Sequence, residues 1–338
     1  MKKTFIIAEA GSNHNRSLEQ AFKLIDVAKD AGCDAVKFQT YSSETLYVKG
    51  TRDPNTGADV SKMIKDIELP REWHKTLKSY SDEKGIEFMS TPFDEAAVLE
   101  LVAIGVKRLK IAGFEAIDPR MVKLVAKTQL PLIISLGIGS NVETIEQILD
   151  WVVEENPKPD ITFLHADPST PTPYEDIHLL QIPKLLQHKS KIPFKAGLSD
   201  HTPGALVPAL AVALGATVIE KHFTLSRKMK GPDHSFAIEP DELKQMVTNI
   251  RIAELCLEEK KGLYSKTEKK QYFFAMRSLV SKIAIKKGEQ LTVDNVTTLR
   301  PYFEGAIPAA AYEHLKLYKA KEDIAENQII PWDQVQKA

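Results

Sequence analysis

The sequence predicts a (β/α)8 barrel followed by a small C-terminal domain, and three observations support this fold class. Short apolar runs rich in β-branched residues recur along the first three quarters of the chain, separated by amphipathic helical stretches. At 338 residues the chain exceeds the length of about 250 residues that such a barrel needs. The composition turns highly charged near residues 258–266, as in a solvated linker. We therefore expect a barrel over residues 1–257, a linker over 258–270 and a second domain over 271–338.

Each predicted strand is followed by a helical pattern with local start signals. Ser17 and Gln20 fit a capping box, Asn141 precedes apolar residues at helical spacing, and Pro240 opens the last long helix of the barrel. The insert 42–70 is longer than the other connections and is expected to include a lid over the active site. The eight predicted strands are 4–10, 35–40, 86–91, 107–112, 132–136, 161–166, 194–199 and 217–222.

The C-terminal domain is expected to hold short strands and turns. Residues 277–280, 283–289 and 324–328 have this pattern, in a unit of about 70 residues whose small core benefits from docking on a larger body.

Polar residues stand at or just after the ends of the predicted strands. The carboxyl ends of barrel strands meet on one face of the barrel, where enzymes of this fold hold their active sites. A set this polar is not expected to fill a barrel interior, so it predicts a binding or catalytic pocket. Its members are Glu9, Lys37, Gln39, Thr91, Lys110, Glu115, Ser135, His165, Ser199, His201, Glu220 and His222.

Two lysines of this set, Lys37 and Lys110, lie in strands with apolar neighbours. Burying an ammonium group without a counter-charge is unfavourable, and an anionic ligand removes that penalty. The alternative is an ion pair inside the protein, for example between Lys37 and Glu9.

His201 and His222 follow consecutive strands, and together they predict a divalent metal site. Neutral imidazoles suit Mn, Fe, Co or Zn, and two protein ligands leave positions open for a substrate oxygen. A closed structural zinc site requires four ligands, which the sequence does not offer. The alternative is a pair of core histidines with satisfied hydrogen bonds. Asp233, after the last strand, is either a further acid at the same mouth or part of an ordinary turn.

Charge and hydropathy exclude several classes of partner. A formal net charge of -1 gives no general attraction to nucleic acid or to an acidic membrane. The first apolar run is too short for a signal sequence, and no stretch approaches the roughly 18 apolar residues of a membrane span. We expect a cytoplasmic protein that acts on small molecules.

Several motifs, in order along nearly the whole chain, make it resemble the sialic acid synthase family, including its legionaminate, pseudaminate and spore-coat polysaccharide branches. The C-terminal part is similar to the antifreeze-like (SAF, β-clip) domain of that family. The motifs cover residues 7–15, 37–40, 90–93, 110–112, 197–202, 220–224, 231–234 and 299–301.

The resemblance implies a transferase that condenses phosphoenolpyruvate with an acetamido sugar to make a nonulosonic acid. It implies that His201 and His222 bind a metal, usually manganese, and that Lys37, Lys110, Ser135 and Ser199 hold phosphoenolpyruvate. Glu9 and Glu115 are implied in proton transfer or sugar contact, with Gln39, Thr91 and Asp233 among the substrate-binding residues. It further implies a domain-swapped homodimer in which Arg300 acts on the partner's barrel.

The chain departs from the family pattern around the sixth strand and at the predicted sugar pocket. Asp167, Pro168 and Thr170 replace the usual threonine, a small polar residue and tyrosine, and an acid close to a phosphate is repulsive unless it points away or is paired. Phe114 precedes Glu115, as in the pseudaminate and spore-coat branches, which argues against N-acetylmannosamine as the acceptor.

Two other functions remain open on the sequence. The loss of polar residues after strand six also fits a non-catalytic, sugar-binding paralogue. A metal-dependent aldolase or isomerase on the same barrel would work without phosphoenolpyruvate.

Overall fold

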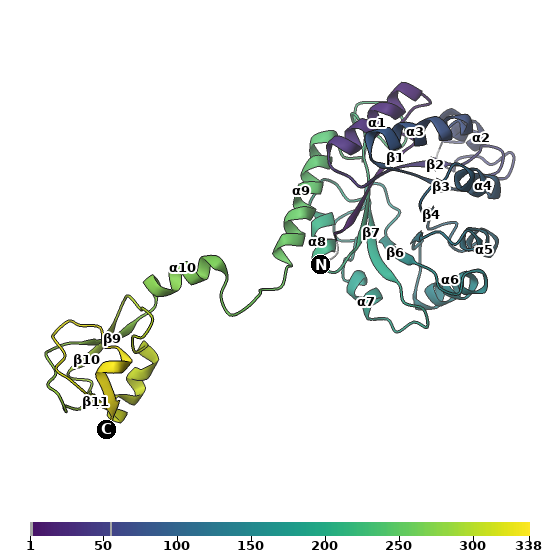
Figure 1. The fold of residues 1–338 in the computed structure, drawn as a ribbon. Coiled ribbons are helices and arrows are strands. Elements are labelled where there is room, and N and C mark those ends of the chain that lie inside the picture. The colour runs from purple at the N-terminus through teal and green to yellow at the C-terminus, as the bar shows by residue number, and fades with distance from the viewer. Residues whose placement is uncertain (1–2, 55) are drawn as a thin grey trace. The chain divides into compact units, whose positions relative to one another are not determined.

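A computed structural model describes residues 3–54 and 56–338. The chain divides into two compact units, Met1–Glu258 and Glu259–Ala338, which are described separately (Figure 1).

The first unit confirms the predicted barrel. In the described residues eight parallel strands pair in the order β3-β2-β1-β8-β7-β6-β5-β4, and β3 and β4 lie side by side, which nearly closes the barrel. The strands are β1 (Phe5–Gly11), β2 (Ala35–Thr40), β3 (Glu87–Pro92), β4 (Leu109–Ile111), β5 (Leu132–Ser135), β6 (Ile161–Ala166), β7 (Lys195–Asp200) and β8 (Val218–His222).

Helices surround the strands (Figure 1), and the predicted start signals act as helix caps with one correction. Asn141 forms a capping box with Thr144, and Pro240 stands in the first turn of its helix. Ser17 accepts a hydrogen bond from the Gln20 backbone, but the Gln20 side chain donates to the Asn13 carbonyl and completes no capping box. The helices are α1 (Leu18–Asp30), α2 (Val60–Ile67), α3 (His74–Lys84), α4 (Glu95–Ala103), α5 (Pro119–Lys127), α6 (Val142–Glu155), α7 (Gln181–Gln187), α8 (Val207–Ala213) and α9 (Pro240–Cys256).

Alternation along the strands builds two apolar layers. One set of side chains, such as Ile6, Ala8 and Phe38, packs between strands and helices. The other set fills the barrel interior with Ile7, Ala35, Met89, Ile133, Leu164 and Val218. Two residues further along most of these strands, the same inward face carries a polar group, such as Glu9, Lys37, Thr91, Ser135 or Glu220, whereas β6 has Ala166 there. The barrel interior is therefore apolar toward the start of the strands and polar at their carboxyl ends.

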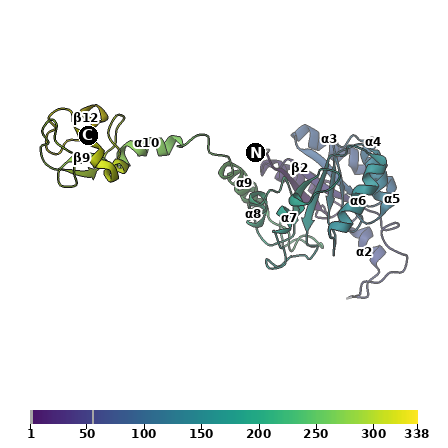
Figure 2. The same cartoon turned by 90° about the horizontal axis from the view of Figure 1, so that it is seen from below.

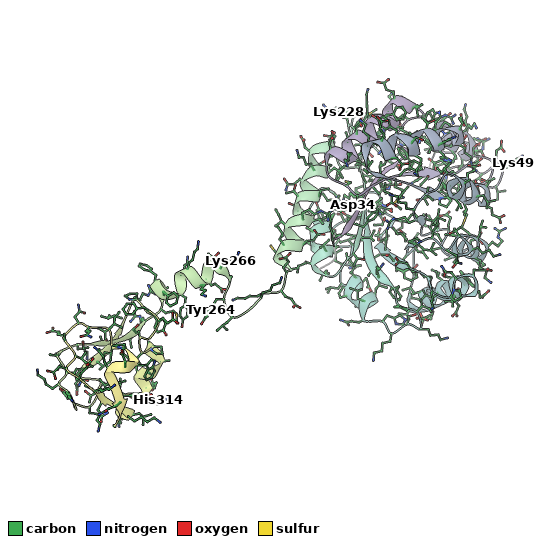
Figure 3. The ribbon with its side chains drawn as sticks, viewed as in Figure 1. Asp34, Lys49, Lys228, Tyr264, Lys266 and His314 are labelled. Atoms are coloured by element: carbon green, nitrogen blue, oxygen red, sulfur yellow. The ribbon has the colours of Figure 1, made fainter. Side chains whose placement is uncertain are left out.

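The insert between β2 and α3 contains α2 and a short 3-10 helix, η1 (Arg71–Trp73). An isolated bridge joins Arg52 to Asp59 within it. Figure 2 shows α2 standing off from the ring of helices, and Figure 3 labels Lys49 at the outer edge of this unit. Its function as a lid stays a prediction.

The second unit has a separate core that includes Leu279, Ile285 and Leu291. It contains α10 (Lys266–Ala275), two antiparallel pairs, β9 (Ser278–Ser281) with β10 (Val296–Leu299) and β11 (Tyr318–Ala320) with β12 (Val335–Lys337), and the 3-10 helices η2 (Ala309–Leu317) and η3 (Trp332–Gln334).

The sequence prediction missed part of this unit. The stretch 258–270 is not all linker, because α10 begins inside it with a capping box between Ser265 and Glu268. Tyr264 and Lys266 flank that start in Figure 3. Ile285 and Ile324 form an isolated bridge where two short strands were expected. Among the described residues, no helix is long and apolar enough to cross a membrane.

Candidate active site

A cavity of about 270 Å³ lies at the carboxyl ends of the barrel strands. The polar part of its lining, called here the polar wall, contains ten of the polar residues predicted for the pocket, namely Glu9, Lys37, Gln39, Thr91, Lys110, Ser135, Ser199, His201, Glu220 and His222. The rest of the lining is apolar or glycine and consists of Phe93, Ala112, Gly113, Phe114, Leu136, Gly137, Ala166 and Pro168. A ligand in this cavity therefore meets both charged groups and apolar surface.

The Lys37 side chain is buried and forms ion pairs with two carboxylates of the protein. The Lys37 ammonium lies 2.8 Å from Glu9 Oε2 and 3.6 Å from Glu220 Oε2, and it donates to Thr91 Oγ1 at 2.8 Å. Burial alone would lower the pKa of Lys37, but Glu220 and Glu9 outweigh it and raise that pKa. For Lys37 the ion-pair alternative is therefore what the structure shows.

Lys110 has a different environment. Its ammonium donates to Ser135 Oγ at 2.7 Å and to the Ile111 carbonyl at 2.9 Å, and both acceptors are neutral. No carboxylate in the described part of the chain forms an ion pair with it, although it is 2% exposed. Burial lowers the pKa of Lys110 to about 8, against the attraction of Glu220. Lys110 thus presents a poorly compensated positive charge to the cavity.

The two glutamates beside Lys37 differ in their protonation. Burial raises the pKa of Glu9 to about 7, and Gln39 donates to Glu9 Oε1 at 2.7 Å. Burial also acts to raise the pKa of Glu220, but Lys110 and Lys37 overcome it and hold that pKa near 2. Glu220 is therefore the more acidic of the two carboxyls, and Glu9 is the one that burial makes easier to protonate.

The two histidines lie together at the cavity wall. Their ring centroids are 5.5 Å apart. His201 Nδ1 donates to the Asp167 carbonyl at 2.6 Å, which leaves the lone pair on Nε2, and His222 Nδ1 is buried without a hydrogen-bond partner. Burial lowers the pKa of both rings, that of His201 to about 4, so both are neutral at physiological pH. The described residues contain no cluster of three or more potential metal ligands.

Glu115, Asp233 and Arg300 are not among the residues that line this cavity. The Glu115 carboxyl is buried near Lys110 with Oε2 unpartnered, and burial raises its pKa. Asp233 Oδ2 accepts from the Ser12 backbone and hydroxyl at 3.1 and 2.9 Å. Gly11, with φ +51°, leaves room for this carboxylate: a Cβ there would lie 2.7 Å from Asp233 Oδ2 and 3.4 Å from His222 Nδ1. Arg300 belongs to the second unit.

A neighbouring cavity of about 660 Å³ is lined by two other residues from the sequence analysis, His165 and Asp167. His165 lines this cavity, not the active-site cavity, because it alternates with the inward-facing Leu164 and Ala166; its Nε2 donates to the Ile177 carbonyl at 2.6 Å. The expectation that His165 joins the active-site set is wrong. The Asp167 carboxylate also lines the larger cavity and accepts from Ser169 N at 2.9 Å. Asp167 does not line the active-site cavity, and whether its carboxylate repels a phosphate stays a prediction.

A charged cavity at the carboxyl ends of a (β/α)8 barrel is the site at which enzymes of this fold bind their substrates. The chain belongs to the NeuB family, whose model matches residues 24–262, and a SAF domain model matches residues 277–336. These matches confirm the resemblance to the sialic acid synthases and identify the second unit as a SAF domain.

The chain is similar to several synthases over most of its length. The N,N'-diacetyllegionaminic acid synthase of Campylobacter jejuni is 38% identical over 98% of this chain and 99% of its own. Pseudaminic acid synthase of the same organism is 37% identical over 96% and 94%. A crystal structure of N-acetylneuraminic acid synthetase from Leptospira borgpetersenii in complex with citrate has a TM-score of 0.71 and 34% identity, and the match covers 80% of this chain and 90% of that one.

Proposed function

We propose that this protein condenses phosphoenolpyruvate with an acetamido-hexose to form a nonulosonic acid, in a metal-dependent reaction that releases phosphate. The observation that carries the proposal is Lys110, a buried ammonium with neutral hydrogen-bond partners at the wall of a cavity that two neutral imidazoles also line. The named synthases among its relatives support the class of product.

The polar wall suits a small polyanion such as phosphoenolpyruvate. Lys110 supplies the charge, and Thr91, Ser135 and Ser199 supply hydroxyl groups around it. Lys37 is already paired, so we assign it to holding Glu9 and Glu220 in place.

The histidines fit a divalent metal. The buried Nδ1 of His222 lacks a hydrogen-bond partner, and the His201 tautomer leaves the lone pair of Nε2 available to a metal. We propose manganese, held by His201 and His222. When bound, the metal supplies Lewis acidity toward the aldehyde of the open-chain sugar.

In the proposed reaction, carbon 3 of phosphoenolpyruvate attacks the aldehyde carbon and forms the new carbon-carbon bond. Water adds at carbon 2, and phosphate leaves with cleavage of the carbon-oxygen bond. Glu9 and Glu115 are the candidate proton carriers, because burial raises the pKa of both carboxyls. We further propose a domain-swapped homodimer in which Arg300 of one copy reaches the sugar in the other barrel.

The test is a coupled assay of phosphate release with a panel of 2-acetamido and 2,4-diacetamido hexoses. Release is expected only when phosphoenolpyruvate, Mn²⁺ and a suitable sugar are present together, and mass spectrometry should then find the condensed acid. Folded, metal-loaded protein that releases no phosphate with any sugar would contradict the proposal. Ligand-induced stabilisation without turnover would indicate a sugar-binding paralogue, and pyruvate-forming cleavage of a nonulosonic acid would indicate an aldolase.

A further inference from the structure

A buried ion pair joins β7 to β8 next to the two histidines, on the face of these strands that is turned away from the active-site cavity. Lys221 Nζ lies 2.6 Å from Asp200 Oδ2, and the two side chains are 2% and 0% exposed. Asp200 precedes His201 and Lys221 precedes His222, and alternation along β7 and β8 turns this pair away from the active-site cavity. Neither residue touches the proposed substrates, so the reaction does not explain why a charged pair is buried here.

Backbone pairing does not extend to His201. The register of β7 with β8 ends at Asp200 opposite Lys221. His222 is still held, because it pairs with Glu9 of β1. One histidine therefore lies in a strand, and the other lies one residue beyond the end of its strand.

Side chains replace the missing backbone pairing on both sides of His201. Asp200 Oδ1 accepts from the Thr202 backbone at 3.0 Å and from its hydroxyl at 2.8 Å. The Lys221 ammonium also donates to the Thr202 carbonyl. Asp200 and Thr202, which flank His201, are thus both bonded to Lys221, which precedes His222. From the other side, the His201 carbonyl accepts from Thr172 N at 3.0 Å.

We infer that Asp200 and Lys221 are positioning residues that set His201 relative to His222 for divalent metal binding. A buried ion pair contributes little net stability compared with apolar packing, but here its hydrogen bonds to Thr202 fix the backbone on both sides of His201. Groups that hydrogen-bond a metal ligand typically change metal affinity by about 10–100-fold when they are removed. Asp200 and Lys221 act on His201 through the backbone at Thr202, so we expect a loss at the lower end of that range. The inference rests on the metal site of the proposed function.

The experiment measures Mn²⁺ affinity of metal-free full-length protein by calorimetry, together with its thermal unfolding. Lys221→Met is expected to weaken Mn²⁺ binding by about tenfold or more, and Lys221→Arg to recover part of the loss. Because Lys221→Met leaves Asp200 buried without a partner, the double variant Asp200→Asn/Lys221→Met is measured beside it. The double variant removes both charges and leaves no unpaired buried charge, so it is expected to fold. Its Mn²⁺ affinity is expected to be reduced, as in Lys221→Met.

Arg108→Met is the matched control. Arg108 joins β4 to β3 by pairing with Glu87 at 2.6 and 3.1 Å, near the start of these strands and away from the histidines. If lower stability alone weakened metal binding, this variant would lose affinity in proportion to its loss of thermal stability. We expect its Mn²⁺ affinity to stay within twofold of that of the unmodified protein.

Two outcomes overturn the inference and are distinguishable. If the unmodified protein binds Mn²⁺ in a manner that depends on His222, and the double variant binds it equally well, the positioning role fails while the metal site stands. If the unmodified protein binds no divalent metal, the metal site of the proposed function and this inference fail together.

Discussion

Replacing Lys110 with methionine is expected to weaken phosphoenolpyruvate binding and, at the same time, to stabilise the ligand-free protein. The lysine is buried, its partners Ser135 and Ile111 are neutral, and burial lowers its pKa from 10.5 to about 8. At about 1.4 kcal/mol per pKa unit, carrying this charge near neutral pH destabilises the fold by up to about 3 kcal/mol. Methionine fills a similar volume without the charge, so it should recover part of that free energy.

The loss of affinity follows from the same charge. A hydrogen bond to a charged group contributes about 1.5–3 kcal/mol, which corresponds to roughly a 10- to 150-fold increase in Kd. Isothermal titration with phosphoenolpyruvate measures the affinity, and urea unfolding of the ligand-free protein measures the stability. Lys195→Met is the control, because Lys195 pairs with Asp160 in an exposed bridge and should change neither quantity appreciably.

The pH dependence has a definite sign. Between pH 8 and 10.5 the unfolded chain keeps its proton on Lys110 while the folded chain loses it, so this group makes stability rise with pH in that window. The stability advantage of Lys110→Met should therefore fade over the same window, and phosphoenolpyruvate affinity of the unmodified protein should fall above about pH 8. A variant that binds phosphoenolpyruvate normally, or that unfolds more readily than the unmodified protein at pH 7, would refute the assignment.

Three further predictions concern other parts of the site. His222→Ala should lose Mn²⁺ binding and activity but keep the circular dichroism of the folded protein, because the ring lines the cavity and does not belong to the apolar part of the barrel interior; equal metal content in both proteins would contradict this. Arg300→Ala should reduce turnover without preventing dimer formation, and mixed dimers with His222→Ala should regain activity if Arg300 acts on the partner; absence of complementation would argue for action within one chain. Asp167→Asn should change phosphoenolpyruvate affinity by less than about twofold, since at roughly 1.4 kcal/mol per tenfold that carboxylate contributes little from the neighbouring cavity; a tenfold gain would show that it repels the ligand.

The strand pattern of the barrel could be predicted because apolar runs and their polar ends are local signals. Lys37, Lys110 and Ser135 were placed at one mouth by the rule that parallel strands share their carboxyl ends. His165 was misplaced because that rule says nothing about which face of the strand a residue occupies. Counting in steps of two from the interior residue Leu164 would have assigned it to the outer face.

Pairing between strands could not be predicted in the same way. Whether Lys37 meets Glu9 or a ligand depends on distances of a few ångströms across neighbouring strands, which a single sequence does not contain. The sequence predicts Glu220 as a polar residue at a strand end. That its pKa is lowered by Lys110 and Lys37 can be known only from the positions of these lysines in the structure. Helix α10 is not predicted because none of its residues is buried, so no apolar stripe at helical spacing marks it in the sequence.

The two buried lysines of the polar wall have different functions. Lys37 forms ion pairs with Glu9 and Glu220 and donates to Thr91, so its contacts define the shape of the wall before any ligand arrives. Lys110 is bound only to neutral groups, so its electrostatic penalty is relieved when an anion enters. An arrangement in which both lysines were paired would leave little charge for a substrate, and one in which neither was paired would be costly to fold. The asymmetry between the two lysines is therefore the feature that makes this wall both stable and able to bind an anion.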